Sequence, residues 1–259
     1  MIKFLARPLA GKKGLILGLA NEHSIAYGCA EAFRSLGADV ALTYADENAK
    51  PHVEPLARAL DAPIFLPCDV RAPEQLENVF QVIEKTWGKL DFALHSIASA
   101  PKQDLHSPLS QCSREGFLEA MEVSCYSFIR MAHLAASMMR DGGTILTMTY
   151  YGADKVIDNY NVMGAVKAAL ESSVRYLAAE LGPKRIRVHA ISPGPTRTRA
   201  ASGIEHFDEL LERAAQRAPE RELVSIEDIG ATTAFLATDY AKLMTGEIVY
   251  VDGGYHIMG

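Results

Sequence analysis

Short apolar segments alternate with helix-like segments along almost the whole chain, and this alternation restricts the fold more than any other feature of the sequence. Strands that are apolar on both sides are typical of a parallel sheet whose crossover helices cover both faces. The pattern therefore predicts a doubly wound, Rossmann-type α/β fold around a seven-stranded parallel sheet. The expected strands are 12–18, 39–44, 64–70, 90–98, 143–150, 187–192 and 247–254. The expected helices are 24–37, 73–87, 113–139, 162–181 and 225–238.

No repeat, low-complexity segment or linker divides the chain, so we expect a single domain over residues 1–259. The least regular segment is 193–224, where a loop rich in proline and glycine leads into a charged helix. Ligands of open α/β sheets bind beyond the carboxyl ends of the strands. Because 193–224 follows the sixth strand, we expect it to form a lid over the substrate.

The composition excludes several other classes of protein. Apolar residues make up 49% of the chain and charged residues 22%, and the net charge is −6, so we expect no nucleic-acid partner. The sequence shows neither the long apolar run of a membrane protein nor the leader-like N-terminus of a secreted one. We therefore expect a cytoplasmic protein. The four cysteines form no CxxC pair and the eight histidines have no ligand spacing, so no metal site is expected.

Two residues of the helix-like segment after 143–150 suggest an active site. Tyr160 and Lys167 are seven residues apart, and at about 100° per residue a helix returns them to nearly the same side, roughly 10 Å apart along its axis. The phenol can donate a hydrogen bond or proton while the ammonium holds hydroxyls or phosphate of the same elongated ligand. Tyr150 ends a predicted strand, where a plain core tyrosine is the alternative, and Tyr151 should point to the opposite face.

The turn after the first strand is a candidate cofactor site. Gly18 permits a tight turn there, and the amides of a helix that starts near Ser24 can meet a pyrophosphate. The segment is not GxGxxG, so a purely structural turn with Ser24 as the helix N-cap is the alternative.

Other strand ends strengthen the case for a dinucleotide. Asp69 follows the third strand, where a carboxylate can accept from an adenine amino group, and 95–99 presents small residues for a ribose. Beyond the second strand, Asp46 would repel a 2′-phosphate and no arginine accompanies it, although Lys50 is near. This favours NADH over NADPH.

These residues together resemble the short-chain dehydrogenase/reductase superfamily, and within it the bacterial NADH-dependent enoyl-acyl carrier protein reductases. Ordinary members carry TGxxxGxG and YxxxK, whereas this chain has a longer glycine turn and a tyrosine seven residues before the lysine. The resemblance runs over essentially the whole chain. The segments that carry it are KGLILGLANEHSIAYG, HSIASAP, NYNVMGAVKAALE, ISPGPTRTRAASGI and GEIVYVDGG.

The resemblance implies a role for each matching residue. Tyr160 would hydrogen-bond the thioester carbonyl, Tyr150 would be the second active-site tyrosine, and Ala100 would lie against substrate. Cofactor contacts are implied for pyrophosphate (Gly18, Ser24, Ile25), adenine (Asp69, Val70), ribose (Ile97, Lys167) and nicotinamide with its phosphate (Thr196, Arg197, Thr198, Arg199, Ala200). The family also suggests a homotetramer. Three residues, Ala45, Ala98 and Asp158, differ from the residues that are commonest in the family. Because Ala45 stands where many relatives contact the adenosine ribose, that contact is not carried over to this chain.

The implied reaction is NADH-dependent reduction of the trans-2 double bond of enoyl thioesters in fatty acid biosynthesis. Hydride addition at C3 collects negative charge on the thioester oxygen, where Tyr160 would donate a hydrogen bond. Lys167 would orient the ribose and lower the pKa of the Tyr160 phenol. The proton for C2, and the choice between acyl carrier protein and coenzyme A as carrier, stay open.

Two other functions are compatible with the fold. A ketone or alcohol enzyme of the superfamily normally has a serine and a tyrosine four residues before the lysine, a position that Met163 occupies here. A non-catalytic NAD-binding protein would need neither Tyr160 nor Tyr150. Met121, Phe128, Met131 and Met163 could line an acyl pocket, but core packing is the preferred explanation.

Overall fold

Seven parallel strands form one sheet, in the order β3-β2-β1-β4-β5-β6-β7, within residues 5–198 and 207–258 that the computed structural model describes. This confirms the predicted Rossmann-type sheet. The carboxyl ends of the strands therefore meet along one edge, as the cofactor hypothesis requires. The strands are β1 (Lys13–Leu17), β2 (Asp39–Tyr44), β3 (Ile64–Pro67), β4 (Phe92–His95), β5 (Gly143–Met148), β6 (Ile186–Pro193) and β7 (Ile248–Val251).

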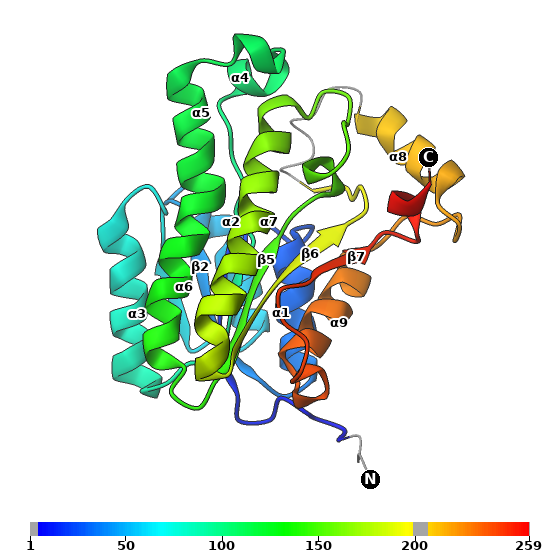
Figure 1. Cartoon of the computed structure of the whole chain (residues 1–259). Coiled ribbons are helices and arrows are strands. Elements are labelled where there is room, and N and C mark those ends of the chain that lie inside the picture. The colour runs from blue at the N-terminus through cyan, green and yellow to red at the C-terminus, as the bar shows by residue number, and fades with distance from the viewer. Residues whose placement is uncertain (1–4, 199–206, 259) are drawn as a thin grey trace.

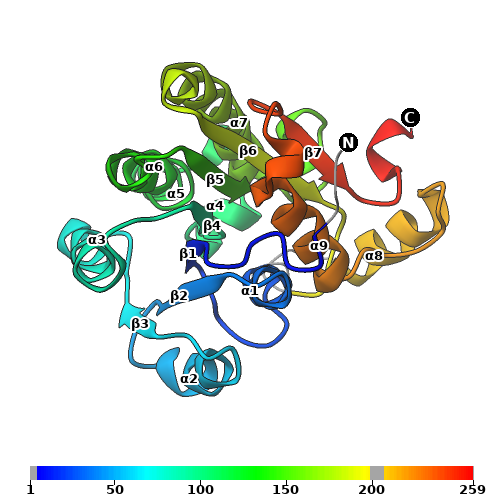
Figure 2. The same cartoon turned by 90° about the horizontal axis from the view of Figure 1, so that it is seen from below.

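Helices cover both faces of the sheet, which explains why its strands are apolar on both sides. Figure 2 shows α1 (Ile25–Ser35), α2 (Lys50–Ala59) and α9 (Ile226–Ala237) on one face. The other face carries α3 (Pro73–Trp87), α6 (Ser127–Met138) and α7 (Asn161–Leu181). Two separate apolar cores result, one on each side of the sheet.

Shorter elements lie in the upper part of the molecule in Figure 1. They are α4 (Lys102–His106), α5 (Arg114–Met121), whose upper end lies near α4, and α8 (Phe207–Arg217). No helix among the described residues is both long and apolar enough to cross a membrane.

Helices α1 and α9 touch through their backbones. A Cβ at Gly28 would lie 2.3 Å from the carbonyl oxygen of Ile226, and one at Gly230 would lie 2.3 Å from the carbonyl oxygen of Gly28. Only glycine allows so close a crossing. The start of α1, which follows the glycine turn, is thereby fixed against an element from the far end of the chain.

Two helical predictions differ from the structure. The single helix expected over 113–139 is divided by a π-helical turn, Glu122–Tyr126, between α5 and α6. Helix α2 has no counterpart among the predicted helices, because Pro51 and Pro55 interrupt the usual helical pattern of that segment. Pro51 lies in the first turn, where proline is tolerated.

Candidate active site

The glycine turn after β1 fits closely against the end of β4. The Ser96 amide donates to the Leu17 carbonyl at 3.1 Å, which holds the two strand ends side by side. Gly18 has φ +100°, and a Cβ there would lie 2.2 Å from the Ser96 carbonyl oxygen and 3.1 Å from Cγ1 of Ile97. The structure therefore brings Gly18 and Ile97 together, and only glycine fits this close approach of the turn to the Ser96 backbone.

Ser24 stabilises the loop that follows Gly18. Its Oγ accepts from the amides of Ala20 (3.1 Å) and Asn21 (2.9 Å) and lies 2.7 Å from the Asn21 carbonyl oxygen. Ser24 is the N-cap residue of α1, as predicted, but its hydroxyl makes no capping bond to the helix. The hydroxyl shapes the loop instead, and α1 starts at Ile25 with the positive end of its dipole beside that loop.

The carboxylate of Asp69 lies two residues beyond β3 and is held by a fork from Arg71. Nη2 of Arg71 donates to Oδ2 at 2.8 Å and Nε donates to Oδ1 at 3.0 Å. These hydrogen bonds hold the pKa of Asp69 below its ordinary value. The Asp69 carboxylate, which precedes Val70, therefore keeps a negative charge that is paired with Arg71 beyond the end of β3.

Tyr160 and Tyr150 meet at the start of α7. Their ring centroids are 5.0 Å apart in an edge-to-face contact, and Tyr160 is 8% exposed. A Cβ at Gly152, in the 3-10 turn after β5, would lie 2.6 Å from Cδ1 of Tyr160, so glycine leaves room for this ring. Tyr160 is the N-cap residue of α7, between Asn159 (φ 63°) and Asn161 (φ 41°). Asparagine tolerates the left-handed backbone better than most residues.

Lys167 is buried two turns into α7 and is tied to the end of β5. Its Nζ donates to the Met148 carbonyl at 2.8 Å, and only 4% of the residue is exposed. Burial lowers its pKa to about 8, against the opposing effects of Cys125 and Glu171. One residue beyond Met148, Thr149 donates to the Glu171 carboxylate at 2.7 Å, which closes a second link between the end of β5 and α7.

The phenols of Tyr150 and Tyr160 are both kept protonated at neutral pH. Burial, and after it the charge of Glu171, raises the pKa of Tyr160. Burial also raises the pKa of Tyr150, whose hydroxyl has no hydrogen-bond partner among the described residues. The expectation that Lys167 lowers the pKa of Tyr160 is wrong: burial and Glu171 raise that pKa, and Lys167 does not contribute to the shift. A protonated phenol remains a hydrogen-bond donor.

Ser124 positions the loop beyond β4, although nothing in the sequence pattern singles it out. This fully buried serine, in the π-helical turn, accepts from the Ser99 amide at 2.9 Å and donates to the Ser99 carbonyl at 3.0 Å. Ile97 and Ala100 lie on the same loop, and both pack against the core. A serine inside a helical pattern carries no local signal of such a contact.

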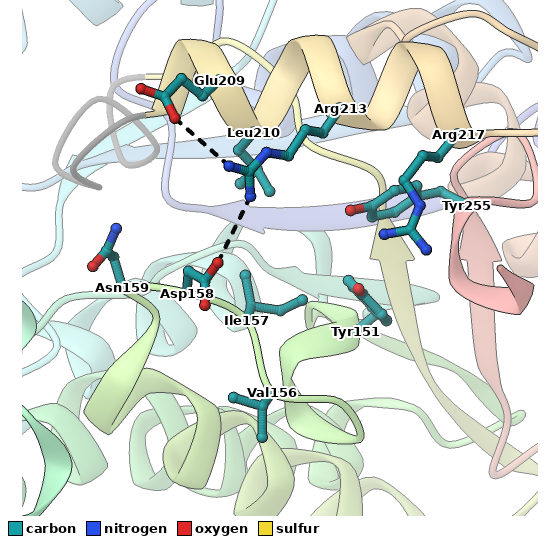
Figure 3. A pocket seen from close by; sticks show the side chains of 10 residues that line it. All are labelled: Tyr151, Val156, Ile157, Asp158, Asn159, Glu209, Leu210, Arg213, Arg217 and Tyr255. Atoms are coloured by element: carbon teal, nitrogen blue, oxygen red, sulfur yellow. Dashed lines mark ion pairs between the residues drawn. The ribbon is translucent and has the colours of Figure 1, made fainter. Parts of the chain in front are cut away.

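A cavity of about 300 Å³ opens between α8 and the residues that precede Tyr160. In Figure 3, Arg213 points from α8 to Asp158 and also pairs with Glu209, at 3.7 Å in each case. The cavity is lined by Tyr151, Val156, Ile157, Asp158, Asn159, Glu209, Leu210, Arg213, Arg217 and Tyr255.

The expectation that Tyr151 points away from Tyr150 is wrong. The alternation of side chains applies only within a strand, and β5 ends at Met148. Tyr151 begins a 3-10 turn, lines the cavity, and contacts the Tyr150 ring at 5.5 Å.

The expected cofactor residues after β6 lie only partly within the described chain. Thr196 donates to the Gly194 carbonyl at 3.0 Å, and Arg197 pairs with Asp208 of α8 at 2.6 Å. Thr198 is the last described residue of this segment; Arg199 and Ala200 lie outside the described residues.

The candidate acyl-pocket residues belong to the core. Phe128, Met131 and Met163 are buried members of the apolar core beside α6 and α7, and Met121 packs against it. This confirms core packing as the explanation of their pattern.

Comparison with known proteins gives consistent results. The family model described as enoyl-(acyl carrier protein) reductase matches residues 18–256. An enoyl-[acyl-carrier-protein] reductase [NADH] of Rhizobium meliloti is 47% identical over 249 residues, which cover 96% of this chain and 92% of the relative. The enoyl-[acyl-carrier-protein] reductase [NADH] FabI of Aquifex aeolicus is 45% identical, over 97% of this chain and 93% of its own.

Solved structures of similar proteins agree in fold. The enoyl-(acyl-carrier-protein) reductase of Anaplasma phagocytophilum in complex with NAD is 45% identical, with a TM-score of 0.94, covering 98% of this chain and 97% of that one. The Bacillus cereus enoyl-acyl carrier protein reductase, with NADP+ and an indole naphthyridinone, is 43% identical with a TM-score of 0.95, covering 98% and 99%.

Proposed function

The chain belongs to the enoyl-(acyl carrier protein) reductase family, and on that premise we propose how its own residues carry out the reaction. The protein reduces the trans-2 double bond of enoyl thioesters of acyl carrier protein with NADH, a step of fatty acid biosynthesis. The observation that carries the assignment of residues is the buried, protonated Tyr160 beside Tyr150 at the carboxyl edge of the sheet.

The residues at this edge fit a dinucleotide. Glycine at position 18 lets the turn pack tightly against the end of β4, and the start of α1 beside this turn favours a phosphate. We assign the pyrophosphate to Gly18, Ser24 and Ile25, the adenine to Asp69 and Val70, and the riboses to Ile97 and Lys167. Thr196, Arg197 and Thr198 complete the site on the nicotinamide side, with Arg199 and Ala200 assigned by resemblance alone.

NADH is the preferred cofactor because the end of β2 is acidic. Asp46 is fixed there by the amide of Ala49, which donates to its Oδ1 at 2.9 Å. Lys50, the nearby cation, lies 3.7 Å from the Glu47 carboxylate and over the Tyr44 ring, so its charge is already partly compensated. A 2′-phosphate would meet net negative charge.

NADH, when bound, supplies the hydride that reduces C3 of the substrate. Tyr160 donates a hydrogen bond to the thioester oxygen, where negative charge collects in the transition state, and its raised pKa keeps the proton in place for that task. Lys167, held by the Met148 carbonyl, directs its ammonium to the ribose. The buried hydroxyl of Tyr150 is available to a polar atom of the substrate, and Ala100 lines the same site.

The whole chain acts as one domain in this proposal, with segment 193–224 as the substrate lid. The support is the position of α8, which forms one wall of the cavity opposite Tyr151 and Ile157. The thioester enters through this cavity to reach Tyr160.

The enzyme is proposed to work in the cytoplasm as a homotetramer. The four cysteines are free thiols, as is usual in a reducing compartment. Large apolar side chains on α5, α7 and the turn before α6 are exposed, as a subunit interface requires: Phe117, Leu118, Tyr126 and Tyr176. Light scattering coupled to size-exclusion chromatography measures the subunit number.

The assay that tests the function follows NADH oxidation with a trans-2-enoyl thioester and, separately, with a 3-ketoacyl thioester. Rapid oxidation with the first, and with NADH faster than with NADPH, is the expected result. Activity with only the 3-ketoacyl thioester would establish a ketone reductase instead. Carrier protein and coenzyme A thioesters, run in parallel, identify the preferred carrier.

A further inference from the structure

A row of four tyrosine rings connects the active site with the C-terminal turn. Beyond the Tyr160–Tyr150 contact, Tyr150 meets Tyr151 at 5.5 Å between centroids, and Tyr151 meets Tyr255 at 5.5 Å. The planes of successive rings are inclined by 65°, 86° and 74°, so each contact is edge-to-face. Edge-to-face packing fixes both the separation and the tilt of neighbouring rings.

Tyr255 lies between α8 and the 3-10 turn that carries Tyr151. It is 7% exposed and forms a small apolar cluster with Ala214 and Ala218, against which Tyr151 packs. Figure 3 shows the rings of Tyr255 and Tyr151 on the same side of the cavity, beneath α8. One side chain thus contacts both the proposed lid and the row of rings.

The turn that carries Tyr255 is rigidly built. The buried carboxylate of Asp252 accepts from the amides of Gly254 (3.0 Å) and His256 (2.8 Å) and pairs with the His256 ring at 2.9 Å. Gly254 has φ +82°, and a Cβ there would lie 3.0 Å from the Pro219 ring. Since β7 leads directly into this turn, the sheet itself determines where Tyr255 lies.

The ring contacts persist at physiological pH. Burial, followed by the proximity of Tyr255, raises the pKa of Tyr151 to about 12. The Tyr151 phenol therefore stays neutral, and no charge draws it into solvent.

We propose that Tyr255 is a positioning residue for the reduction: through Tyr151 it holds the Tyr150 ring against Tyr160. It also seats α8 over the cavity through Ala214 and Ala218. This inference rests on the proposed function, since it assigns the row of rings to enoyl thioester reduction. Tyr255 touches neither the reacting atoms nor the cofactor in this assignment.

The test is a double-mutant cycle between Tyr255→Ala and Tyr151→Ala, measured as kcat for a trans-2-enoyl thioester and as the Kd of NADH. Each single variant is expected to lower kcat at least fivefold, while the Kd of NADH changes less than twofold. If Tyr255 acts through Tyr151, the double variant loses no more than the worse single variant. Tyr255→Phe, which keeps the ring, should restore kcat to within twofold of the wild type.

The control cycle pairs Tyr151→Ala with Tyr240→Ala, because Tyr240 lies in the turn after α9 and outside the row of rings. In this control cycle, the fold-change in kcat of the double variant should equal the product of the fold-changes of the two single variants. If Tyr255→Ala does not fold, Tyr255→Leu, which keeps apolar volume without a ring, is measured with the same expectation.

Wild-type kcat in Tyr255→Ala, or fold-changes that multiply in the Tyr255/Tyr151 cycle, would overturn the inference. A wild-type enzyme that does not oxidise NADH with any enoyl thioester would overturn the function instead.

Discussion

At the scale of single residues, burial determines the charge state of the two central residues of the proposed active site. Tyr160 and Lys167 are both nearly inaccessible to solvent, and burial stabilises the neutral form of each relative to the charged form. The phenol is neutral throughout the physiological range, whereas the ammonium is close to its titration point. The two residues should therefore respond differently to substitution and to pH.

Tyr160→Phe should lower kcat for enoyl thioester reduction by about 100-fold, since one oxyanion-type hydrogen bond contributes that order of rate. The Kd of NADH should change little, because the ring remains. Stopped-flow measurement of NADH oxidation gives kcat, and fluorescence titration gives the Kd. Tyr176→Phe on α7 is the matched control and should behave as wild type, because it keeps the ring that we assign to the subunit interface and loses only a hydroxyl outside the active site. Unchanged kcat in Tyr160→Phe would remove this residue from the reaction.

The kcat/KM for NADH should fall as the pH rises through about 8. The folded-state pKa of Lys167 is lowered to about 8, so the ammonium is present below that pH and is lost above it. The profile of kcat/KM reports groups of the free enzyme. In Lys167→Met the value should be low and should no longer fall near pH 8. If kcat/KM for NADH still falls near pH 8 in Lys167→Met, the fall belongs to a group other than Lys167.

At the scale of elements, glycines set how closely the site-bearing segments approach. Gly28 and Gly230 allow α1 and α9 to cross with their backbones in contact, and Gly152 leaves space for the Tyr160 ring. Hydrogen bonds then lock the elements together, as Lys167 and Thr149 do between the end of β5 and α7. The geometry of the site is thus a property of helix and strand packing.

Gly28→Ala should destabilise the protein, because the new Cβ would lie 2.3 Å from a backbone oxygen that cannot move without its helix. Overpacking of this kind costs about 1–3 kcal/mol of unfolding free energy, which corresponds to a thermal midpoint lower by roughly 2–10 °C for a chain of this size. Differential scanning calorimetry measures the midpoint.

Gly182→Ala is the control for that substitution. Gly182 follows α7 with φ −53°, and a Cβ there would have no described atom within 4 Å. The thermal midpoint of this variant should stay equal or rise slightly, since alanine restricts the unfolded chain. Equal losses in both variants would show that the α1–α9 crossing has no special role.

At the scale of the whole molecule, two buried histidines make stability depend on pH. Burial, and then the charge of Lys167, lowers the pKa of His95 to about 3; burial, and then Arg187, lowers the pKa of His189 to about 4. Ser127 donates to the Val123 carbonyl, so Nε2 of His95 donates to Ser127 at 2.7 Å and the ring is neutral. For His189, a contact with the Met244 backbone opposes the shift but does not offset burial.

The free energy of unfolding should fall as the pH drops below about 6.5, the ordinary histidine pKa. From there down to the folded pKa values, the unfolded chain binds protons that the folded chain does not, so unfolding is favoured. By pH 5 each histidine should account for a loss of about 2 kcal/mol. Denaturant titrations between pH 7 and pH 5 measure this loss.

His189→Leu should reduce that pH dependence, because an apolar side chain occupies the core without a titratable group. His52→Leu, at an exposed position, is the control and should leave the dependence unchanged. A pH dependence identical in both variants and in the wild type would exclude His189 as its source.

The sequence by itself determined the fold class and pointed to Tyr160 and Lys167 as the central pair of candidate site residues. Strands 39–44 and 143–148 are apolar on both sides because both faces of a parallel sheet are covered, and this pattern is local. The Tyr160–Lys167 spacing is also a local pattern, although only Lys167 lies inside the regular part of α7: Tyr160 is the N-cap residue, and Asn161 has φ 41°. Gly18 could be recognised because a tight turn needs a glycine there.

The tertiary structure alone decided how those residues are held and which others join them. Ser124 bonds to Ser99, and Tyr255 reaches Tyr151 across the chain, through contacts that no local pattern encodes. The raised pKa of Tyr160 likewise depends on burial by distant segments and then on the charge of Glu171, not on the lysine that the sequence suggested. Periodicity is a property of neighbours along the chain, whereas burial and close approach are created only when separate segments pack.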